Sequence, residues 1–142
     1  MNLAVKLLIV LTSLKESTSL SVMFEIFGYF GSRLLFQLRV GLSPLKAHKF
    51  RHNFSDTTND ICDCSTGCET TKHFLLECPL HRATRRILFN SINPILLSYD
   101  LVNISNDQMV SLLLYGHVSL KSVENQIVLK STIAYLKSSD RF

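Results

Sequence analysis

The 142-residue sequence lacks the patterns that mark the common enzyme classes. It has no glycine-rich loop that could cradle nucleotide phosphates. No two aspartates are adjacent, and carboxylates nowhere gather as two-metal phosphoryl transfer requires. Serine, histidine and cysteine occur without a spacing that would pair a nucleophile with a base. We therefore expect a protein that is not an enzyme and that has no small-molecule substrate.

Long hydrophobic runs are scarce as well. An apolar run at residues 7–11 follows a lysine and imitates a signal peptide, with residues 17–19 in the place of a cleavage site. The run is shorter than the apolar region of a signal peptide, and Lys15 and Glu16 interrupt any membrane span. We expect an intracellular protein of the cytoplasm or nucleus without membrane contact, and residues 1–32 stay unassigned.

Tryptophan is absent and only three prolines are present, but neither fact excludes a fold class. Apolar residues make up 46% of the chain, which is ordinary for a globular protein. At this length one small domain with a flexible end is expected. The formal net charge of +4 is too mild to argue by itself for a nucleic-acid partner.

What the sequence does contain is a concentration of metal ligands at residues 62–81. All four cysteines lie there, together with His73 and His81. Thiolate sulfur and imidazole nitrogen suit tetrahedral zinc, and four protein ligands would close its coordination sphere to water. The set expected to bind Zn²⁺ is Cys62, Cys64, His73 and Cys78. Cys68 is an alternative ligand, because its spacing from Cys64 fits the usual range for zinc sites.

Two disulfides are the alternative use of four cysteines, as in small secreted proteins. Cys62 and Cys64 are too close to pair comfortably, and disulfides would leave His73 without a role. A third interpretation is that the thiols are simply free and buried.

The ligand spacing requires particular local structure. Cys62 and Cys64 would point to opposite faces of an extended strand, so a turn is expected at residues 65–67. Thr70 is expected to cap a short helix that carries His73.

A continuous α-helix would not bring the last two ligands together, because His73 and Cys78 would lie about 140° apart around it. We expect Pro79 to push Cys78 out of the helical conformation and back toward His73.

The remaining histidines are given structural roles. His81 is expected at the surface of the following helix. His48 and His52, four residues apart, could share a helix face and a second metal ion. Neither has a carboxylate or thiolate companion nearby, so the structural interpretation is favoured.

Basic residues lie on both sides of the expected metal loop. If that loop folds back, the two clusters could flank one groove suited to phosphates, although charge runs usually form solvated helix faces. Only Phe36 and Phe50 interrupt the basic residues, so little base stacking is expected. The residues expected to contact nucleic acid are Arg33, Arg39, Lys46, Lys49, Arg51, Arg82, Arg85 and Arg86.

The expected fold is mainly α: a small zinc-stabilised helical module with a Cys/His loop and two further C-terminal helices. Hydrophobic spacing predicts helices at residues 33–40, 80–92, 109–115 and 121–136, with a short helical turn opened by Ser43-Pro44. The expected divisions are an unassigned segment at 1–32, the zinc-binding module at 33–95 and a helical extension at 96–142.

Helix boundaries and core positions follow from the same patterns. Breaks or ends are expected at Gly28, Gly31, Gly41, Asn93-Pro94 and Gly116, an irregular linker at 95–104, and a capping box at Ser105 and Gln108. The side chains expected to face the core are Leu34, Leu35, Leu38, Ile87, Leu88, Val123, Ile127, Leu129, Ile133 and Leu136.

Taken together, these motifs resemble the C-terminal zinc-binding tail of reverse transcriptases from non-LTR retrotransposons. The resemblance runs from about Leu34 to the C-terminus and is strongest at the metal motif. It implies zinc, RNA or DNA as a partner, and a reverse-transcriptase core as a further partner; Cys68 is not part of the pattern. The matching residues, in order, are Arg39-Val40-Gly41, His48, His52, Cys62, Cys64, Glu69-Thr70, His73 and Cys78-Pro79.

The sequence departs from a whole reverse transcriptase in two respects. The palm of such an enzyme needs paired aspartates, which are missing, and the residues before Leu34 are too few to form a polymerase core. The expectation is a zinc- and nucleic-acid-binding tail without polymerase activity of its own. The alternatives are a retroelement remnant without function and, less favoured, a small secreted disulfide-containing protein.

Overall fold

The computed structural model describes residues 20–142, and the expected mainly α fold is confirmed there. The described residues form no named strand and one isolated β-bridge, between Ile61 and Cys68. The signal-like run at residues 7–11 lies outside this range. None of the described helices combines the length and apolar character needed to cross a membrane. The elements are α2 (Leu20–Val40), α3 (Lys46–Arg51), the π-helix η1 (His73–Glu77), the 3₁₀ helix η2 (Pro79–His81), α4 (Arg82–Ser98), α5 (Asn106–Tyr115) and α6 (Ser122–Ser138).

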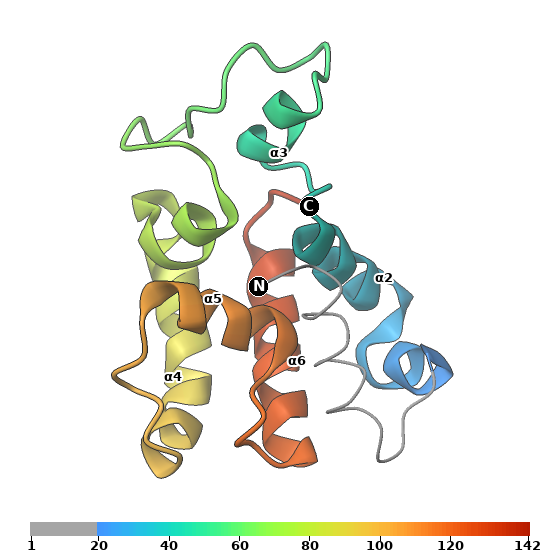
Figure 1. Ribbon diagram of the computed structural model, residues 1–142, viewed down its shortest axis with the longest axis vertical. Helices are drawn as coiled ribbons and strands as arrows, with labels where there is room; N and C mark the ends of the chain where they lie inside the picture. Colours follow the sequence, from blue (N-terminus) through green and yellow to red (C-terminus); the bar gives the residue numbers. More distant parts are fainter. Residues whose placement is uncertain (1–19) are drawn as a thin grey trace.

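Helix α6 is the central element and packs against α2, α4 and α5 (Figure 1). The predicted core positions Leu129, Ile133 and Leu136 are confirmed. The prediction for Val123 and Ile127 is wrong, because these side chains are 65% and 40% exposed. At about 100° per residue they fall on the opposite face of α6 from the buried stripe. The residues 62–81 lie at the end of the bundle that also holds α3 and the C-terminus (Figure 1).

Helix α4 continues past the point where Asn93-Pro94 was expected to end it, so that prediction is wrong. The predicted irregular linker begins at residue 99 rather than 95. Pro94 sits inside the helix on its exposed face, where water can bind the carbonyl that loses its N–H partner. Ile92 and Leu96 are fully buried on either side of it. Each burial contributes about 2 kcal/mol, and together they exceed the cost of about 3 kcal/mol for an interior proline.

The buried face of α4 also explains why one predicted core residue of this helix is exposed. Leu88 is buried as predicted, but Ile87 is 68% exposed, so its predicted place in the core is wrong. The buried stripe of α4 is formed by Leu88, Ile92 and Leu96, at steps of four residues. Ile87 precedes that stripe by about 100° and faces solvent.

Three glycines within or directly after α2 have different structural roles. Gly28 has φ +70° and kinks the helix, and Gly41 has φ +72° and follows its last residue, as predicted. Gly31 does not break the helix, contrary to expectation. A Cβ atom built there would come within 2.9 Å of Ile133 Cγ2, so the glycine lets α2 approach α6 closely.

Helix α5 begins directly after the predicted capping residue Ser105, three residues before the predicted start at 109, and ends at Tyr115 as predicted. The Ser105 side chain accepts from the Gln108 backbone N–H, and the Gln108 side chain accepts from the Ser105 backbone N–H, which completes the capping box. Gly116 ends the helix with φ +76°. The Asn125 side chain then holds the turn, because its Oδ1 accepts from the His117 N–H at 2.8 Å.

Helix α3 begins at Lys46, two residues later than Ser43-Pro44 predicted, because Leu45 is still extended, with ψ 138°. The Ser43 backbone N–H donates to His48 Nδ1 at 3.3 Å, so Nδ1 is the unprotonated ring nitrogen. Nε2 therefore carries the proton and donates to Thr71 Oγ1 at 3.2 Å. Both ring nitrogens of His48 are used within the fold, while His52 is exposed, which agrees with the structural interpretation.

The neutral state of His48 makes stability depend on pH. Burial lowers the pKa of His48, and the nearby charges of Arg51 and His52 lower it further, while Glu69 opposes them. In the unfolded chain His48 takes up a proton near pH 6.5. The folded state resists protonation, so this contribution to stability is present above pH 6.5 and is lost as pH falls toward the lower folded pKa.

We therefore expect His48→Asn to lose less stability than the parent protein between pH 7.5 and pH 5.5. The control is His52→Asn, which removes an exposed histidine from the same helix end and one of the lesser influences on His48, so most of the parent's pH dependence should remain. Urea unfolding of the three proteins at both pH values measures the difference. Parallel pH profiles for parent and His48→Asn would contradict the assigned neutral state.

Candidate metal centre

The four predicted ligands come together at the end of the bundle. One ligand atom from each of Cys62, Cys64, His73 and Cys78 lies within 4.8 Å of all the others. The Cys62 and Cys78 sulfurs are 3.7 Å apart, and the Cys64 sulfur is 3.2 Å from His73 Nε2. A tetrahedral zinc site has edges of about 3.8 Å between sulfurs and about 3.6 Å between sulfur and nitrogen. The four residues are close enough to hold a metal ion.

A tight turn brings the first two ligands onto one side. The Ser65 N–H donates to Cys62 O at 2.8 Å, and the Cys62 N–H donates to Gly67 O at 2.9 Å. Ser65 adopts φ +61°, a left-handed conformation that is uncommon outside glycine. The predicted turn at residues 65–67 is confirmed, and the Ile61–Cys68 bridge closes it.

The second pair of ligands is brought together by a feature that the sequence analysis missed. Thr70 caps the helix start as predicted, with its Oγ1 accepting from the His73 N–H at 3.1 Å. The following turn is then a π-helix, in which the Cys78 N–H donates to His73 O at 2.7 Å. A π-turn places residues five apart on nearly the same face. Cys78 leaves the helical region with ψ 122°, as expected before Pro79.

The open end of the π-helix is closed by Arg85. Its Nε donates to Leu75 O at 2.8 Å, and its Nη2 donates to Cys78 O at 2.7 Å and to Phe74 O at 3.3 Å. These carbonyls would otherwise lack partners, because a helix end leaves its last acceptors free. Arg85 thus holds the backbone that carries Cys78.

His73 is oriented by a carboxylate one turn away. Its Nε2 faces Cys64, while its Nδ1 lies 3.6 Å from Glu77 Oε2. A metal-binding histidine typically turns its second ring nitrogen to a carboxylate, which favours the tautomer with a free Nε2 lone pair. The side chain of His73 is buried, so this orientation is also fixed by packing.

The thiols have unequal environments. Burial raises the pKa of Cys62 to about 12, which makes a cation necessary to hold that sulfur as a thiolate. The Thr66 hydroxyl, 3.0 Å from the Cys64 sulfur, is the largest cause that lowers the pKa of Cys64 to about 6. Cys64 is also the least buried of the four ligands and gives the site its opening toward solvent.

Cys68 and His81, the other two candidate ligands of the motif, lie outside this group. Cys68 is on the far side of the turn, where a hydrogen bond with Asp60 raises the pKa of its thiol. His81 was expected at the surface, but it is 9% exposed and packs edge-on against Phe74, with ring centroids 5.0 Å apart. That prediction is wrong because η2 turns His81 inward before α4 begins. All four cysteines are free.

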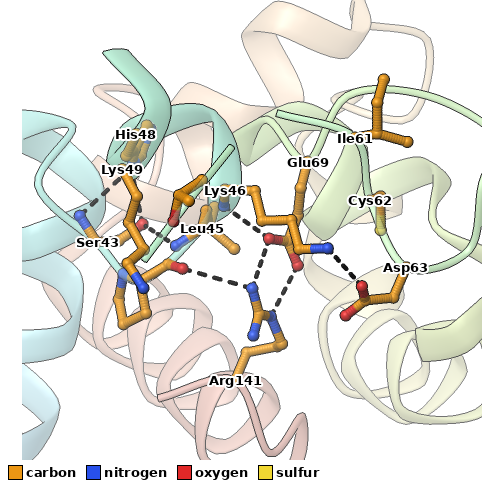
Figure 2. A network of polar contacts seen from close by, with 12 residues as sticks. Ser43, Leu45, Lys46, His48, Lys49, Ile61, Cys62, Asp63, Glu69 and Arg141 are labelled. Carbon is orange, nitrogen blue, oxygen red and sulfur yellow. Dashed lines mark hydrogen bonds and ion pairs between the residues drawn. The ribbon is translucent and has the colours of Figure 1, made fainter. Parts of the chain in front are cut away.

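An ion pair between buried Glu69 and partly buried Arg141 anchors the metal loop to the rest of the fold. Figure 2 shows the Arg141 guanidinium facing the Glu69 carboxylate, with Nε–Oε1 and Nη2–Oε2 distances of 2.7 and 2.5 Å. Glu69 is 2% exposed, and its Oε2 also accepts from the Lys46 backbone N–H at 2.7 Å. Beside it, Lys46 Nζ bridges to Asp63 within the loop at 2.5 Å.

Four of the eight basic residues expected to bind nucleic acid are engaged inside the chain. Arg39 is largely buried, donates to Leu114 O at 2.6 Å and lies over the Tyr115 ring, and burial lowers its pKa to about 10. Lys46 pairs with Asp63, Lys49 pairs with Asp56, and Arg85 caps the π-helix. The four that are exposed are Arg33, Arg51, Arg82 and Arg86.

Comparison of the chain with protein-family models, with curated proteins and with solved structures finds no match in any of the three.

We expect the protein purified under reducing conditions to carry about one metal ion per chain, and zinc is the ion that three thiolates and one imidazole favour. Cys62→Ser should lose that ion, since it removes a buried ligand. Cys68→Ser is the matched control and should keep it. Elemental analysis together with native mass spectrometry measures the stoichiometry. A requirement for Cys68 without one for Cys62 would show that the ligand set is wrong.

We expect Arg141→Ala to lower the free energy of unfolding by about 3 kcal/mol, because it leaves the Glu69 carboxylate buried without its partner. Arg141→Lys keeps the charge but loses the bidentate hydrogen bonding, so the free energy of unfolding should fall by less than in Arg141→Ala. Adding Glu69→Gln to Arg141→Ala should recover part of the loss. Urea unfolding of the metal-loaded proteins checks these values, and a change below about 0.5 kcal/mol for Arg141→Ala would contradict them.

Proposed function

We propose that the protein is a zinc-stabilised module that binds RNA or DNA through its phosphates and has no polymerase activity of its own. The single observation that carries the zinc part is the convergence of Cys62, Cys64, His73 and Cys78. Four protein ligands leave no coordination position for a reacting water, which favours a structural metal over a catalytic one. A structural zinc contributes directly to folding free energy.

The resemblance to the zinc-binding tail of non-LTR reverse transcriptases supports the nucleic-acid part of the proposal. The residues that carry it have related places in the fold: Glu69 anchors the loop, and Thr70 caps the turn that carries His73. A reverse-transcriptase core is the protein partner that the resemblance suggests. A remnant that folds around zinc but binds nothing is the competing proposal.

The exposed arginines supply the surface for phosphate contacts. Arg82 and Arg86 are one turn apart at the start of α4, directly after the metal loop. Arg51 ends α3, next to the exposed ring of Phe50. Charge supplies affinity for any phosphate backbone, whereas so few exposed rings offer little base stacking. Binding should therefore be weak, sensitive to salt and only slightly dependent on sequence.

We expect Arg82→Ala with Arg86→Ala to weaken binding to a single-stranded RNA and to reduce the slope of log K against log salt by about 1.4, or about 0.7 for each lost phosphate contact. Arg85 stays unchanged, because its substitution would disturb the metal centre. The matched control is Lys121→Ala with Lys130→Ala, which removes two exposed charges from the α6 region. Fluorescence anisotropy at several salt concentrations measures the slopes.

Removal of zinc by a chelator should abolish binding, because the loop that separates the two basic regions would unfold. Equal slopes for the parent and the Arg82/Arg86 variant would contradict the proposed surface. Absence of binding to both RNA and DNA by the zinc-loaded parent would favour the remnant.

A further inference from the structure

A cleft next to the metal loop has a lining that fits a phosphate. It has a volume of about 410 Å³ and lies between α3, the helical turn that follows Thr70, and the start of α5. Side chains that are distant in the sequence meet on its walls. They include His48, Arg51, Thr71, Lys72, Asp107 and Ser111.

Two cations line this cleft without a partner of their own. Arg51 comes from the end of α3 and Lys72 from the turn before the π-helix, and both are exposed. Within residues 25–142, no ion pair or hydrogen bond engages either side chain. This separates them from Lys46 and Lys49, whose charges are paired with aspartates. Two unpaired cations on one concave wall raise the local concentration of anions.

Thr71 adds a directed hydrogen-bond donor. His48 Nδ1 accepts from the Ser43 N–H, so its Nε2 proton points at Thr71 Oγ1, 3.2 Å away. The Thr71 oxygen is thereby an acceptor toward His48, and its own hydroxyl proton is free to donate elsewhere. Because Thr71 lines the cleft, that donor can serve a ligand oxygen there. Ser111 on α5 offers a second hydroxyl on the opposite wall.

One carboxylate in the cleft would repel a bound anion. Asp107 lies in the first turn of α5 and also lines the cleft. It offsets one of the two cations, so binding of a phosphate should be modest. It also offers a test, because removing its charge should strengthen the binding of any anion and weaken the binding of a cation.

We infer that this cleft binds a phosphate group, with Arg51 and Lys72 as its cations and Thr71 as a hydroxyl donor. The inference rests on the proposed function in one respect, which is that the phosphate belongs to a nucleic-acid backbone. A free phosphate or a phosphate monoester has the same recognition chemistry, and the experiment separates the two sources. The volume leaves room for a phosphodiester with an attached sugar.

The test uses the full zinc-loaded chain, with inorganic phosphate and a short single-stranded RNA as probes. Phosphate should shift the backbone amide resonances of Thr71 and Lys72 in NMR spectra. Arg51→Gln with Lys72→Gln should remove those shifts, weaken RNA binding about tenfold and lower the salt slope by about 1.4. Asp107→Asn should tighten RNA binding several-fold. The Arg82/Arg86 variant is the control, and its phosphate-induced shifts should match those of the parent.

The outcomes separate the site from the function. If the Arg51/Lys72 variant binds RNA like the parent while the Arg82/Arg86 variant is weakened, the cleft proposal is overturned and the proposed function stands. If phosphate shifts Thr71 and Lys72 but neither RNA nor DNA binds, the cleft is a site for free phosphate and the proposed function is overturned. If phosphate leaves both amides unchanged and Asp107→Asn has no effect on RNA binding, the cleft is not a phosphate site.

Discussion

The carboxylate of Glu69 is the group on which the arrangement around the metal loop depends. A buried carboxylate is costly unless it is paired and fully hydrogen-bonded. Here its partners come from two segments outside the loop: the Lys46 backbone N–H at the start of α3, and Arg141 after α6. If Arg141 moved away, the buried carboxylate would be left without its counter-charge. The metal loop is therefore held to the helical core by electrostatics as well as by packing.

The metal centre and the helical core also share their supports. Phe74, in the π-helix between His73 and Cys78, is fully buried and packs against Tyr135 of α6, whose hydroxyl donates to Phe74 O at 2.6 Å. Arg85 of α4 donates to the same carbonyl. A ligand-bearing turn is thus fixed from two helices at once. Bound metal would add its folding free energy to a scaffold that already brings the ligands together.

The ligand set, the turn between the ligands and the start of α5 could be predicted from the sequence, because each depends on residues that are close together in the chain. The four ligands lie within 17 positions of the chain, and residues 65–67 are Ser, Thr and Gly, which favour a turn. Ser105 and Gln108 form their capping box within four positions. What was missed depends on distant packing. Burial of Ile92 and Leu96 against the core carries α4 through Pro94, and the face of α6 that is buried follows from its neighbours rather than from its own composition. The pairing of Glu69 with Arg141 has no local signal at all.

The separation between Glu69 and Arg141 has a consequence for how the protein is made. The two residues are 72 positions apart, and a ribosome adds about 5 to 20 residues per second. The last of the four ligands, Cys78, is 63 positions before Arg141, so the loop is synthesised about 3 to 13 seconds before that residue. During that interval the Glu69 carboxylate lacks the arginine that pairs with it in the folded chain. A metal ion that entered the site during this interval would be in place before Arg141 pairs with Glu69 and fixes the loop to the helical core.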